Sequence, residues 1–329
     1  MRKLVTRIAC VALVAAAIAA LAALLPACGE GKKSVRVFAA DALAASFREI
    51  EAAFEKHHPD IDVRLDIMGS VLATRFAPWR RGDVLAVSDH RLVEKILSPR
   101  HATWVAKFAG TEIVLASHTS SARRAEINAD NWFDILLSPG IRYGYANPSQ
   151  DPCGYYTHVC WALAQKHYFA SRGNDRPLAR ELEDACPPER IALDANRLIT
   201  DYLNLARIDY AFVYRVHAID QKLPYLTLPR EINLGDRTLA AEYAKVQLGV
   251  PDYKGGKELL SGSPIAFGIT ILKDAANAPG AMEFVKFVLS DEGQAILKRS
   301  GFEPIVPALV PKWGKAPQEI LAALAKPEP

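Results

Sequence analysis

Segments with the pattern of buried β-strands alternate with helical segments along most of this 329-residue chain. The first pair is Ser34 to Ala40, a short apolar strand, and Ala42 to His58, in which large apolar side chains recur at helical spacing. Because a helix between two strands returns the chain to the same sheet edge, this alternation predicts an α/β fold with mainly parallel sheets. Half of the residues are hydrophobic, so a chain of this length can form two domains or one large one.

The same patterns predict the remaining elements. Strands are expected at residues 61–67, 84–87, 112–117, 141–146, 207–214, 224–228, 245–250 and 265–272. Helices are expected at residues 71–79, 131–137, 152–168, 178–185, 195–205, 275–289 and 291–298. Such sheets bind ligands at the C-terminal edge of their strands, where loops and helix N-termini converge. The candidate site is therefore formed by the loops at Asp41, Ser70, Asp89, Asp151 and Tyr214.

The stretch NPSQDPCGYYTHVC, from Asn147 to Cys160, joins a predicted strand to a long predicted helix. Each of its two prolines favours an extended conformation in the preceding residue, and Pro152 suits the first position of a helix that Asp151 caps. A carboxylate is thus expected at a helix N-terminus. The residues alone allow two roles for Asp151, a helix cap or a contact to a bound ligand.

The N-terminus has the pattern of an export signal. Three basic residues precede an uncharged apolar run from Ile8 to Leu25. The sequence LPACG at the end of this run resembles the bacterial lipobox, in which the cysteine becomes the lipidated N-terminus. We therefore expect a lipoprotein signal peptide at residues 1–27, lipidation of Cys28 and a tether at residues 28–34. An uncleaved membrane anchor is the alternative. The expected location is periplasmic or at the cell surface.

The charge of the chain bears on its partners. Of the 40 basic residues, three lie in the predicted signal peptide, so the mature chain has 37 basic and 37 acidic residues. Phosphate binding requires a clustered cationic face, and no basic run of useful length is present. Nucleic acid is therefore not expected as a partner.

Three cysteines remain after the signal peptide and the lipobox. Because Cys153 belongs to the loop at the start of the long helix, we expect a disulfide between Cys160 and Cys186 in an exported chain. Three buried free thiols are the alternative. The spacing offers no metal site, since Cys153 and Cys160 lie seven residues apart and lack a second pair.

Several segments together identify a resemblance that runs from about Ser34 to Ala308. They are VFAAD, IMGS, NWFDILLSPGIRYGYANPSQDPCGYY, IDYAFVYR, LPREINL, FGITI and GFEPIVPA. In this order and spacing the chain resembles the tungstate/molybdate-binding proteins of ABC importers, in their archaeal-type branch. The resemblance implies a type II periplasmic-binding-protein fold, in which two α/β lobes close on an oxyanion. We expect residues 35–117 and 245–329 in lobe I and residues 118–244 in lobe II.

The resemblance also implies roles for three residues. Ser70 matches a serine that contacts oxyanion oxygens, and Tyr214 matches a tyrosine at the wall of the site. Asp151 matches a carboxylate that bonds the metal centre of the oxyanion directly. Because a carboxylate repels a dianion, this role requires a hard oxygen ligand that completes a hexacoordinate tungsten or molybdenum.

The sequence departs from the family at several site positions. Val213 stands where the family usually has a second carboxylate, a Glu, and Ala42 stands where it usually has a Ser. Asp41, where the family usually has a Gly, offers a replacement carboxylate from the facing lobe or a helix cap. Tyr156 and His217 also differ from the usual residues, so we expect a rebuilt pocket.

The function implied by the resemblance is a non-enzymatic, monomeric binding lipoprotein without a cofactor. It would capture tungstate or molybdate between its lobes and deliver the oxyanion to an ABC permease. A first alternative keeps the fold but moves the specificity to another small anion or organic ligand. A second is an exported hydrolase, with Cys153 or Ser70 as nucleophile and His158 or His217 as base, although no nucleophile elbow or third orienting residue accompanies them.

Overall fold

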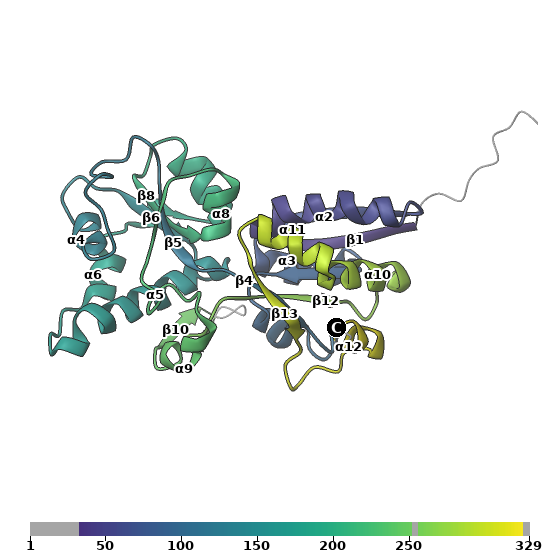
Figure 1. The fold of residues 1–329 in the computed structure, drawn as a ribbon. Helices are drawn as coiled ribbons and strands as arrows, with labels where there is room; N and C mark the ends of the chain where they lie inside the picture. The colour runs from purple at the N-terminus through teal and green to yellow at the C-terminus, as the bar shows by residue number, and fades with distance from the viewer. Residues whose placement is uncertain (1–32, 252–255, 325–329) are drawn as a thin grey trace, which may run out of the picture.

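The computed structural model describes residues 33–251 and 256–324. The predicted signal peptide, Cys28 and most of the predicted tether lie outside these residues. Within the described ranges, no helix is both long and apolar enough to cross a membrane. The chain forms two lobes, each built on its own sheet, and the lobes lie side by side (Figure 1).

The first lobe, on the right in Figure 1, contains a six-stranded sheet with the order β13-β4-β12-β3-β1-β2. Its strands are β1 (Lys33–Ala40), β2 (Ile61–Met68), β3 (Val84–Val87), β4 (Ala106–Gly110), β12 (Ala266–Ile271) and β13 (Glu303–Leu309). Its main helices are α2 (Ala44–His57), α3 (Ser70–Trp79), α10 (Ala278–Leu289), α11 (Asp291–Arg299) and α12 (Gln318–Leu324). Successive side chains of β1 enter different cores, since Val37 belongs to the core that contains Phe47 of α2, and Phe38 belongs to the core that contains Val71 of α3. Helices therefore cover both faces of this sheet.

The second lobe contains a five-stranded sheet with the order β7-β6-β8-β5-β9. Its strands are β5 (Ile113–Ser117), β6 (Tyr143–Ala146), β7 (Ile191–Ala192), β8 (Tyr210–Tyr214) and β9 (Tyr225–Thr227). Its helices are α4 (Trp132–Leu136), α5 (Pro152–Tyr168), α6 (Leu178–Asp184), α7 (Ala195–Arg197) and α8 (Arg215–Asp220). The hairpin of β10 (Gln247–Pro251) and β11 (Lys257–Ser261) forms a separate two-stranded sheet, whose β10 contacts α5.

Shorter helical segments connect these elements. They are α9 (Ala240–Tyr243), η1 (Asp41–Leu43), η2 (Val93–Leu97), η3 (Ala170–Arg172), η4 (Pro188–Arg190), η5 (Leu198–Leu203) and η6 (Arg237–Leu239). The predicted helix at 195–205 corresponds to α7 together with η5. The predicted helix that starts at Ala42 begins as η1 and continues as α2.

Aromatic packing fixes the long helix α5 against the second sheet. The ring of Trp161, on α5, packs edge-on against Phe212 of β8, with ring centroids 5.4 Å apart. Trp132 contacts the same ring at 5.8 Å. Since Asp151 caps α5 and Tyr214 ends β8, this packing also fixes the two residues relative to each other.

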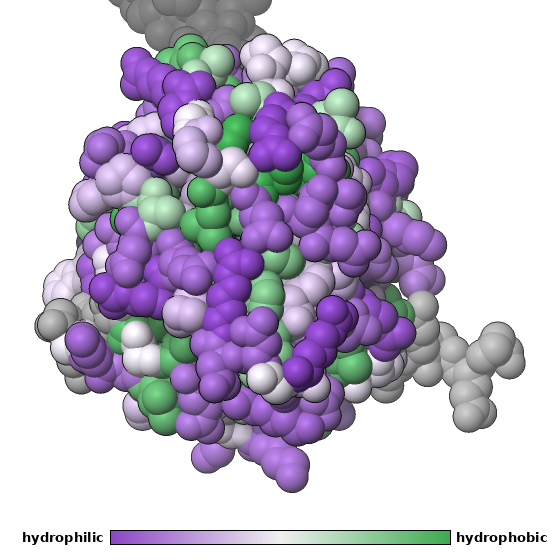
Figure 2. All heavy atoms as spheres, turned by 90° about the vertical axis from the view of Figure 1, so that its left-hand side faces the viewer, coloured by the Kyte–Doolittle hydropathy of each residue, from purple (hydrophilic) through white to green (hydrophobic). Residues whose placement is uncertain are grey.

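The outer end of the second lobe faces the viewer in Figure 2 and is mainly hydrophilic. Hydrophobic residues on this face form small separate groups rather than one continuous patch (Figure 2). Such scattered apolar residues are normal on a face that stays in contact with water. Nothing on this face of the lobe suggests a hydrophobic docking area.

The two-lobe α/β fold is confirmed, but the prediction of mainly parallel sheets is wrong. In the first sheet, β1 pairs in parallel with β2 and β3, whereas β12 pairs antiparallel with β3 and β4. In the second sheet, β6 pairs in parallel with β7 and β8, whereas β5 pairs antiparallel with β8 and β9. A strand reached through a helical crossover must run parallel to its predecessor, but a strand that enters from the other lobe has no such constraint.

The predicted lobe boundaries also need correction. The strand Ile113–Ser117, expected in lobe I, pairs with β8 in the second sheet. The chain therefore passes between the lobes at Thr111 and Glu112, before this strand rather than after it. It re-enters the first sheet at β12, about twenty residues after the predicted boundary at 245. A fully buried strand has the same apolar pattern in either lobe, so the pattern does not show which sheet it joins.

The predicted disulfide between Cys160 and Cys186 is wrong in this structure. Both are buried free thiols, as is Cys153. Cys186 Sγ lies 3.4 Å from the carbonyl oxygen of Tyr143, to which it donates, and Cys160 packs in the core. The alternative of three buried thiols is therefore the one that the structure supports, and burial raises the pKa of each of these thiols.

We expect these three thiols to stay unreactive until the protein unfolds. In a chain with Cys10 and Cys28 replaced by serine, a thiol reagent should label none of them in the native state and all three in denaturant without reductant. Burial excludes the reagent and disfavours the reactive thiolate. Mass spectrometry of the labelled chain checks this. Labelling of only one cysteine in denaturant would instead indicate that the other two form a disulfide.

Candidate functional site

Asp41 connects the two lobes. It follows β1 of the first lobe, and its Oδ1 accepts a hydrogen bond from the N–H of Ala42 at 3.0 Å. Its Oδ2 accepts the N–H of Asn196, in α7 of the second lobe, at 3.2 Å. The same oxygen lies 3.6 Å from Nε2 of His217, on α8 of the second lobe. Asp41 is therefore a helix-start residue whose carboxylate reaches across to the other lobe.

Asp151 lies in the second lobe and caps α5 as predicted. Its Oδ1 accepts the N–H of Cys153 at 2.9 Å, within the first turn of α5. Its Oδ2 accepts the N–H of Ala195, the first residue of α7, at 2.8 Å. The side chain is almost completely buried, so one carboxylate holds the starts of two helices together.

Tyr214 and His217 complete what we call the central cluster, formed by Asp41, Asp151, Tyr214 and His217. The rings of Tyr214 and His217 stack with their centroids 5.7 Å apart and an interplanar angle of 10°. Both side chains are buried, and among the described residues neither the Tyr214 hydroxyl nor a ring nitrogen of His217 has a hydrogen-bond partner. Buried polar groups without partners are uncommon, so the Tyr214 hydroxyl and the His217 ring nitrogens are candidates to contact a bound ligand.

The charges of the central cluster influence one another. Burial raises the pKa of Asp151 to about 7, with a further rise from Asp41, while the two backbone N–H groups oppose it. Burial also acts to raise the pKa of Asp41, but the His217 imidazole and two backbone N–H groups outweigh it, so this pKa is lowered. The two carboxylates thus differ, with Asp41 ionised at neutral pH and Asp151 close to its midpoint.

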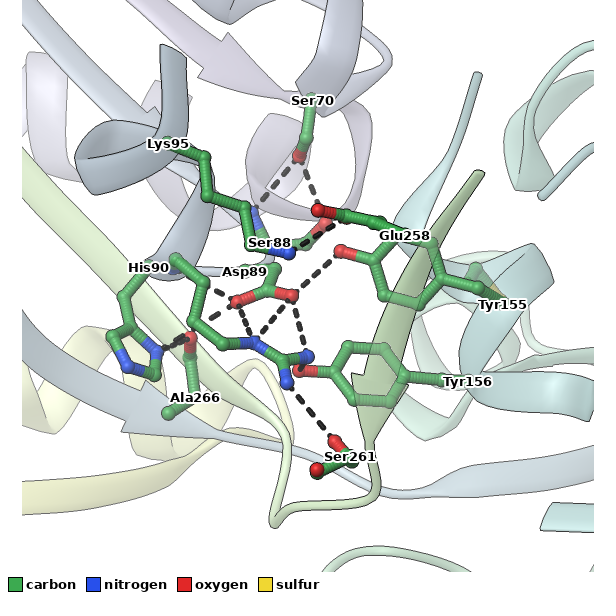
Figure 3. Close-up of polar contacts among 12 residues, drawn as sticks. Ser70, Ser88, Asp89, His90, Lys95, Tyr155, Tyr156, Glu258, Ser261 and Ala266 are labelled. Carbon is green, nitrogen blue, oxygen red and sulfur yellow. Dashed lines mark hydrogen bonds and ion pairs between the residues drawn. The ribbon is translucent and has the colours of Figure 1, made fainter. Parts of the chain in front are cut away.

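Ser70 lies at the start of α3. Its hydroxyl forms a hydrogen bond with the Ser88 hydroxyl at 2.8 Å and accepts the N–H of Ser88 at 2.9 Å (Figure 3). The preceding Gly69 faces the second lobe, because a Cβ placed there would lie 3.6 Å from Cβ of Asp194 and 3.7 Å from the Gln150 carbonyl oxygen. The Ser70 loop therefore meets the second lobe.

The two positions where the sequence departs from the resembled family lack polar side chains in the structure too. Val213 is fully buried near the end of β8, where it pairs with Val114 of β5. Ala42 is half-buried and contributes its N–H to Asp41. Residue 213 therefore contributes only packing, and residue 42 contributes a backbone donor but no hydroxyl.

A second group of polar residues crosses the lobe boundary, and sequence reasoning identified only part of it. We call Asp89, Arg91, Tyr155 and Tyr156 the interlobe cluster. Asp89 Oδ2 accepts the Tyr155 hydroxyl at 2.6 Å and Arg91 Nη2 at 2.7 Å (Figure 3). Arg91 Nη2 also donates to the Tyr156 hydroxyl at 2.8 Å, and Nη1 donates to the Ser261 carbonyl at 3.1 Å.

The interlobe cluster joins the loop after β3 to the first turn of α5. Burial alone would raise the pKa of Asp89, but the guanidinium of Arg91 outweighs it and holds this pKa far below its usual range. Beside the cluster, Lys95 forms an ion pair with Glu258 of β11 at 2.6 Å (Figure 3). The order Ser-Asp-x-Arg directly after a buried strand indicates Asp89 as a candidate site residue. The sequence gives no such signal for its partner Tyr155, which lies more than sixty positions away.

The structure offers no support for the hydrolase alternative. The Ser70 hydroxyl pairs with Ser88, and the thiol of Cys153 contacts the carbonyl oxygen of Phe212 at 3.8 Å. The ring of His158 stacks on Trp161, with centroids 5.0 Å apart, and burial lowers its pKa. Neither proposed nucleophile has an imidazole as its recorded partner, as a nucleophile and its base require.

A cavity of about 860 Å³ lies away from both clusters. It is lined by residues of the first lobe and includes Lys33, His58, Asn277, Glu283 and Lys286. None of the predicted site residues lines it. The candidate site is therefore identified by the meeting of buried polar side chains between the lobes.

Comparison with solved structures supports the fold. The periplasmic molybdate-binding protein of Azotobacter vinelandii aligns with a TM-score of 0.58 at 18% identity, over 82% of this chain and 98% of that one. The sulfate-binding protein SubI of Mycobacterium tuberculosis aligns with a TM-score of 0.59 at 15% identity, over 84% and 88%. The two-lobe architecture is thus that of periplasmic binding proteins.

Comparison of sequences gives the family. An uncharacterized solute-binding protein of Petrotoga mobilis is 35% identical over 287 residues, which cover 86% of this chain and 88% of the relative. The molybdate/tungstate-binding protein WtpA of Pyrococcus abyssi is 31% identical over 320 residues, covering 88% and 90%. A family model described as bacterial extracellular solute-binding protein matches residues 35–303. This chain therefore belongs to the bacterial extracellular solute-binding protein family.

Proposed function

We propose that this chain captures tungstate or molybdate between its two lobes and delivers the oxyanion to an ABC permease. The observation that carries the proposal is the 31% identity to a molybdate/tungstate-binding protein over 88% of this chain. The buried position of Asp151 at the meeting of the lobes supports it, because this is the residue that the resemblance assigns to the ligand.

Asp151 is the proposed direct ligand of the metal centre. A carboxylate has about four lone-pair sites, and each oxygen of Asp151 uses one of them on a backbone N–H. The capping role and the coordinating role are therefore compatible. Asp41 brings a second carboxylate from the facing lobe, although Val213 supplies none, and Tyr214 and Ser70 supply hydroxyl groups.

We propose that this chain is a monomeric lipoprotein, held at the membrane by lipidated Cys28 and located in the periplasm or at the cell surface. The basic N-terminus, the apolar run and the LPACG sequence support this anchoring. We propose no cofactor, since the oxyanion is cargo. The 37 basic and 37 acidic residues of the mature chain support a partner other than nucleic acid.

A second candidate function is a binding protein of the same fold with specificity for another small anion or organic ligand. The specific observation in its favour is the apolar, fully buried Val213. Without a carboxylate at residue 213 and a hydroxyl at residue 42, the site has lost two polar groups that distinguish the resembled family.

Thermal unfolding with a panel of anions separates the two candidates. Tungstate or molybdate at one hundred times its dissociation constant should stabilise the protein by about 2.7 kcal/mol, because it binds only the folded state. The panel also contains sulfate, phosphate and small organic acids. A shift with one of these and none with tungstate or molybdate would favour the second candidate, and no shift with any would count against both.

An Asp151→Ala variant tests the coordinating role separately. If it unfolds cooperatively and binds tungstate unchanged, the role of Asp151 as a ligand is refuted while transport of the oxyanion remains possible.

A further inference from the structure

His217 is the buried residue of the central cluster whose hydrogen-bonding capacity is least used. Its side chain is 7% exposed, and neither ring nitrogen has a hydrogen-bond partner among the described residues. It lies on α8, three residues after Tyr214, and stacks on that ring. The Tyr214 hydroxyl has no partner in the described part of the chain either. Two buried side chains of one lobe thus offer unused polar atoms where that lobe meets the other.

The charges that face His217 are negative. Asp41 approaches from the first lobe with its Oδ2 at 3.6 Å from Nε2. Asp151 at the start of α5, Asp194 at the start of α7 and Asp220 on α8 itself also act on the ring. Burial alone would lower the pKa of His217, but Asp41 and the other carboxylates outweigh burial, so this pKa is raised. The surrounding carboxylates therefore favour the protonated form of the ring.

We infer that His217 donates a charge-assisted hydrogen bond from its protonated ring to an oxygen of the bound oxyanion. The inference rests on the proposed function and adds a ligand-contacting residue to it. The imidazolium attracts a dianion and offers an N–H donor to one of its oxygens. His217 thus supplies a polar contact in a site that lacks the side-chain polar groups usual at residues 213 and 42.

Asp41 has a positioning role in this arrangement. Its Oδ2 lies beside Nε2 of His217 and also accepts the N–H of Asn196. The carboxylate therefore favours protonation of the ring, while hydrogen bonds from the backbone fix its own position. A carboxylate of the first lobe, Asp41, thus influences the charge of His217 in the second lobe.

Calorimetric titration of tungstate between pH 7.5 and 9.5 tests the inference. Asp151, with a pKa of about 7, is mostly ionised by pH 8, so changes in affinity above that pH report on His217. The wild-type affinity should fall about tenfold per pH unit above the pKa of His217, since binding then requires uptake of one proton. His217→Gln should bind at least tenfold more weakly at pH 7.5 and show no such dependence.

His118→Gln is the control, because this half-buried histidine pairs with Ser120 rather than with a residue of the central cluster. It should keep the wild-type affinity and pH profile. A His217→Gln variant with wild-type affinity and the wild-type pH slope would overturn the inference and leave the proposed function standing. Absence of tungstate binding to the wild type at every pH would overturn both.

A second variant keeps the test decisive if His217→Gln does not fold. Asp41→Asn removes the charge that holds the proton on the ring, so the decline in tungstate affinity should begin at lower pH than in the wild type. An Asp41→Asn profile that coincides with the wild-type profile would contradict the pairing and overturn the inference.

Discussion

Replacement of Gly154 by alanine should lower the free energy of unfolding by about 3 kcal/mol or more and disturb the candidate site at the same time. A Cβ at this position would lie 2.1 Å from the carbonyl oxygen of Ala146, 2.7 Å from the nitrogen of Pro148 and 2.8 Å from the carbonyl carbon of Asn147. All three are backbone atoms and cannot move aside as a flexible side chain would. The first turn of α5 must therefore separate from the end of β6, and Asp151 must move with it.

Urea denaturation of Gly154→Ala measures this effect against a matched glycine. In the described part of the chain, no atom lies within 4 Å of a Cβ added to Gly249 in β10. Gly249→Ala should therefore change the free energy of unfolding by no more than about 0.5 kcal/mol. If Gly154→Ala and Gly249→Ala unfold at the same urea concentration, Gly154 is not required for the close packing of α5 on the preceding loop.

Replacement of Arg91 by methionine should cost about 3–5 kcal/mol of stability, because it leaves the carboxylate of Asp89 buried without its counter-ion. Asp89 is almost completely buried and accepts hydrogen bonds from Arg91 Nε and Nη2 as well as from Tyr155. Methionine keeps most of the apolar stem of the arginine, so the loss reports on charge rather than on packing.

A double variant separates charge from shape in this cluster. Adding Asp89→Asn to Arg91→Met removes the uncompensated charge and should recover a large part of the lost stability in urea denaturation. Arg124→Met, on an exposed loop, is the control and should unfold like the wild type. Equal stability of Arg91→Met and the wild type would show that the ion pair does not stabilise the fold.

The hydrogen bonds from Tyr155 and Tyr156 connect this ion pair to the second lobe. The ion pair itself lies within the loop after β3, whereas the two hydroxyls come from the first turn of α5. The cluster therefore stabilises the contact between lobes in addition to the first lobe alone. Tyr155 and Tyr156 lie near the start of α5, which Asp151 caps. The start of α5 therefore contributes both to the contact between the lobes and to the candidate site.

Much of the fold follows from patterns in the chain. The predicted order of strands and helices is found in the structure, and the N-cap at Asp151 is confirmed by its bond to the N–H of Cys153. The strands β4, β7, β11 and β13 and the helices α8, α9 and α12 were not predicted. The sequence of β13, EPIVPAL, contains two prolines, which weaken a strand pattern although they are tolerated at a sheet edge, where β13 lies.

The errors share a physical cause. A pattern of apolar residues reports burial along one element, and burial is satisfied equally well by either sheet and by either strand direction. The antiparallel pairing of β12 and the placement of β5 in the second lobe depend on where the chain passes between lobes. In the same way, two cysteines on buried elements looked suited to a disulfide, but Cys160 and Cys186 remain separate thiols in the core.

By itself, the sequence determined the class of fold, the capped start of α5 and the set of loops at which a ligand is expected, because all of these depend on neighbouring residues. Only the tertiary structure brought His217 to Asp41, and Asp89 and Arg91 to Tyr155 and Tyr156. These contacts join residues from different lobes, and their geometry depends on how the whole chain packs. The charge of the central cluster follows from that packing, since burial and opposing charges act only once the lobes meet.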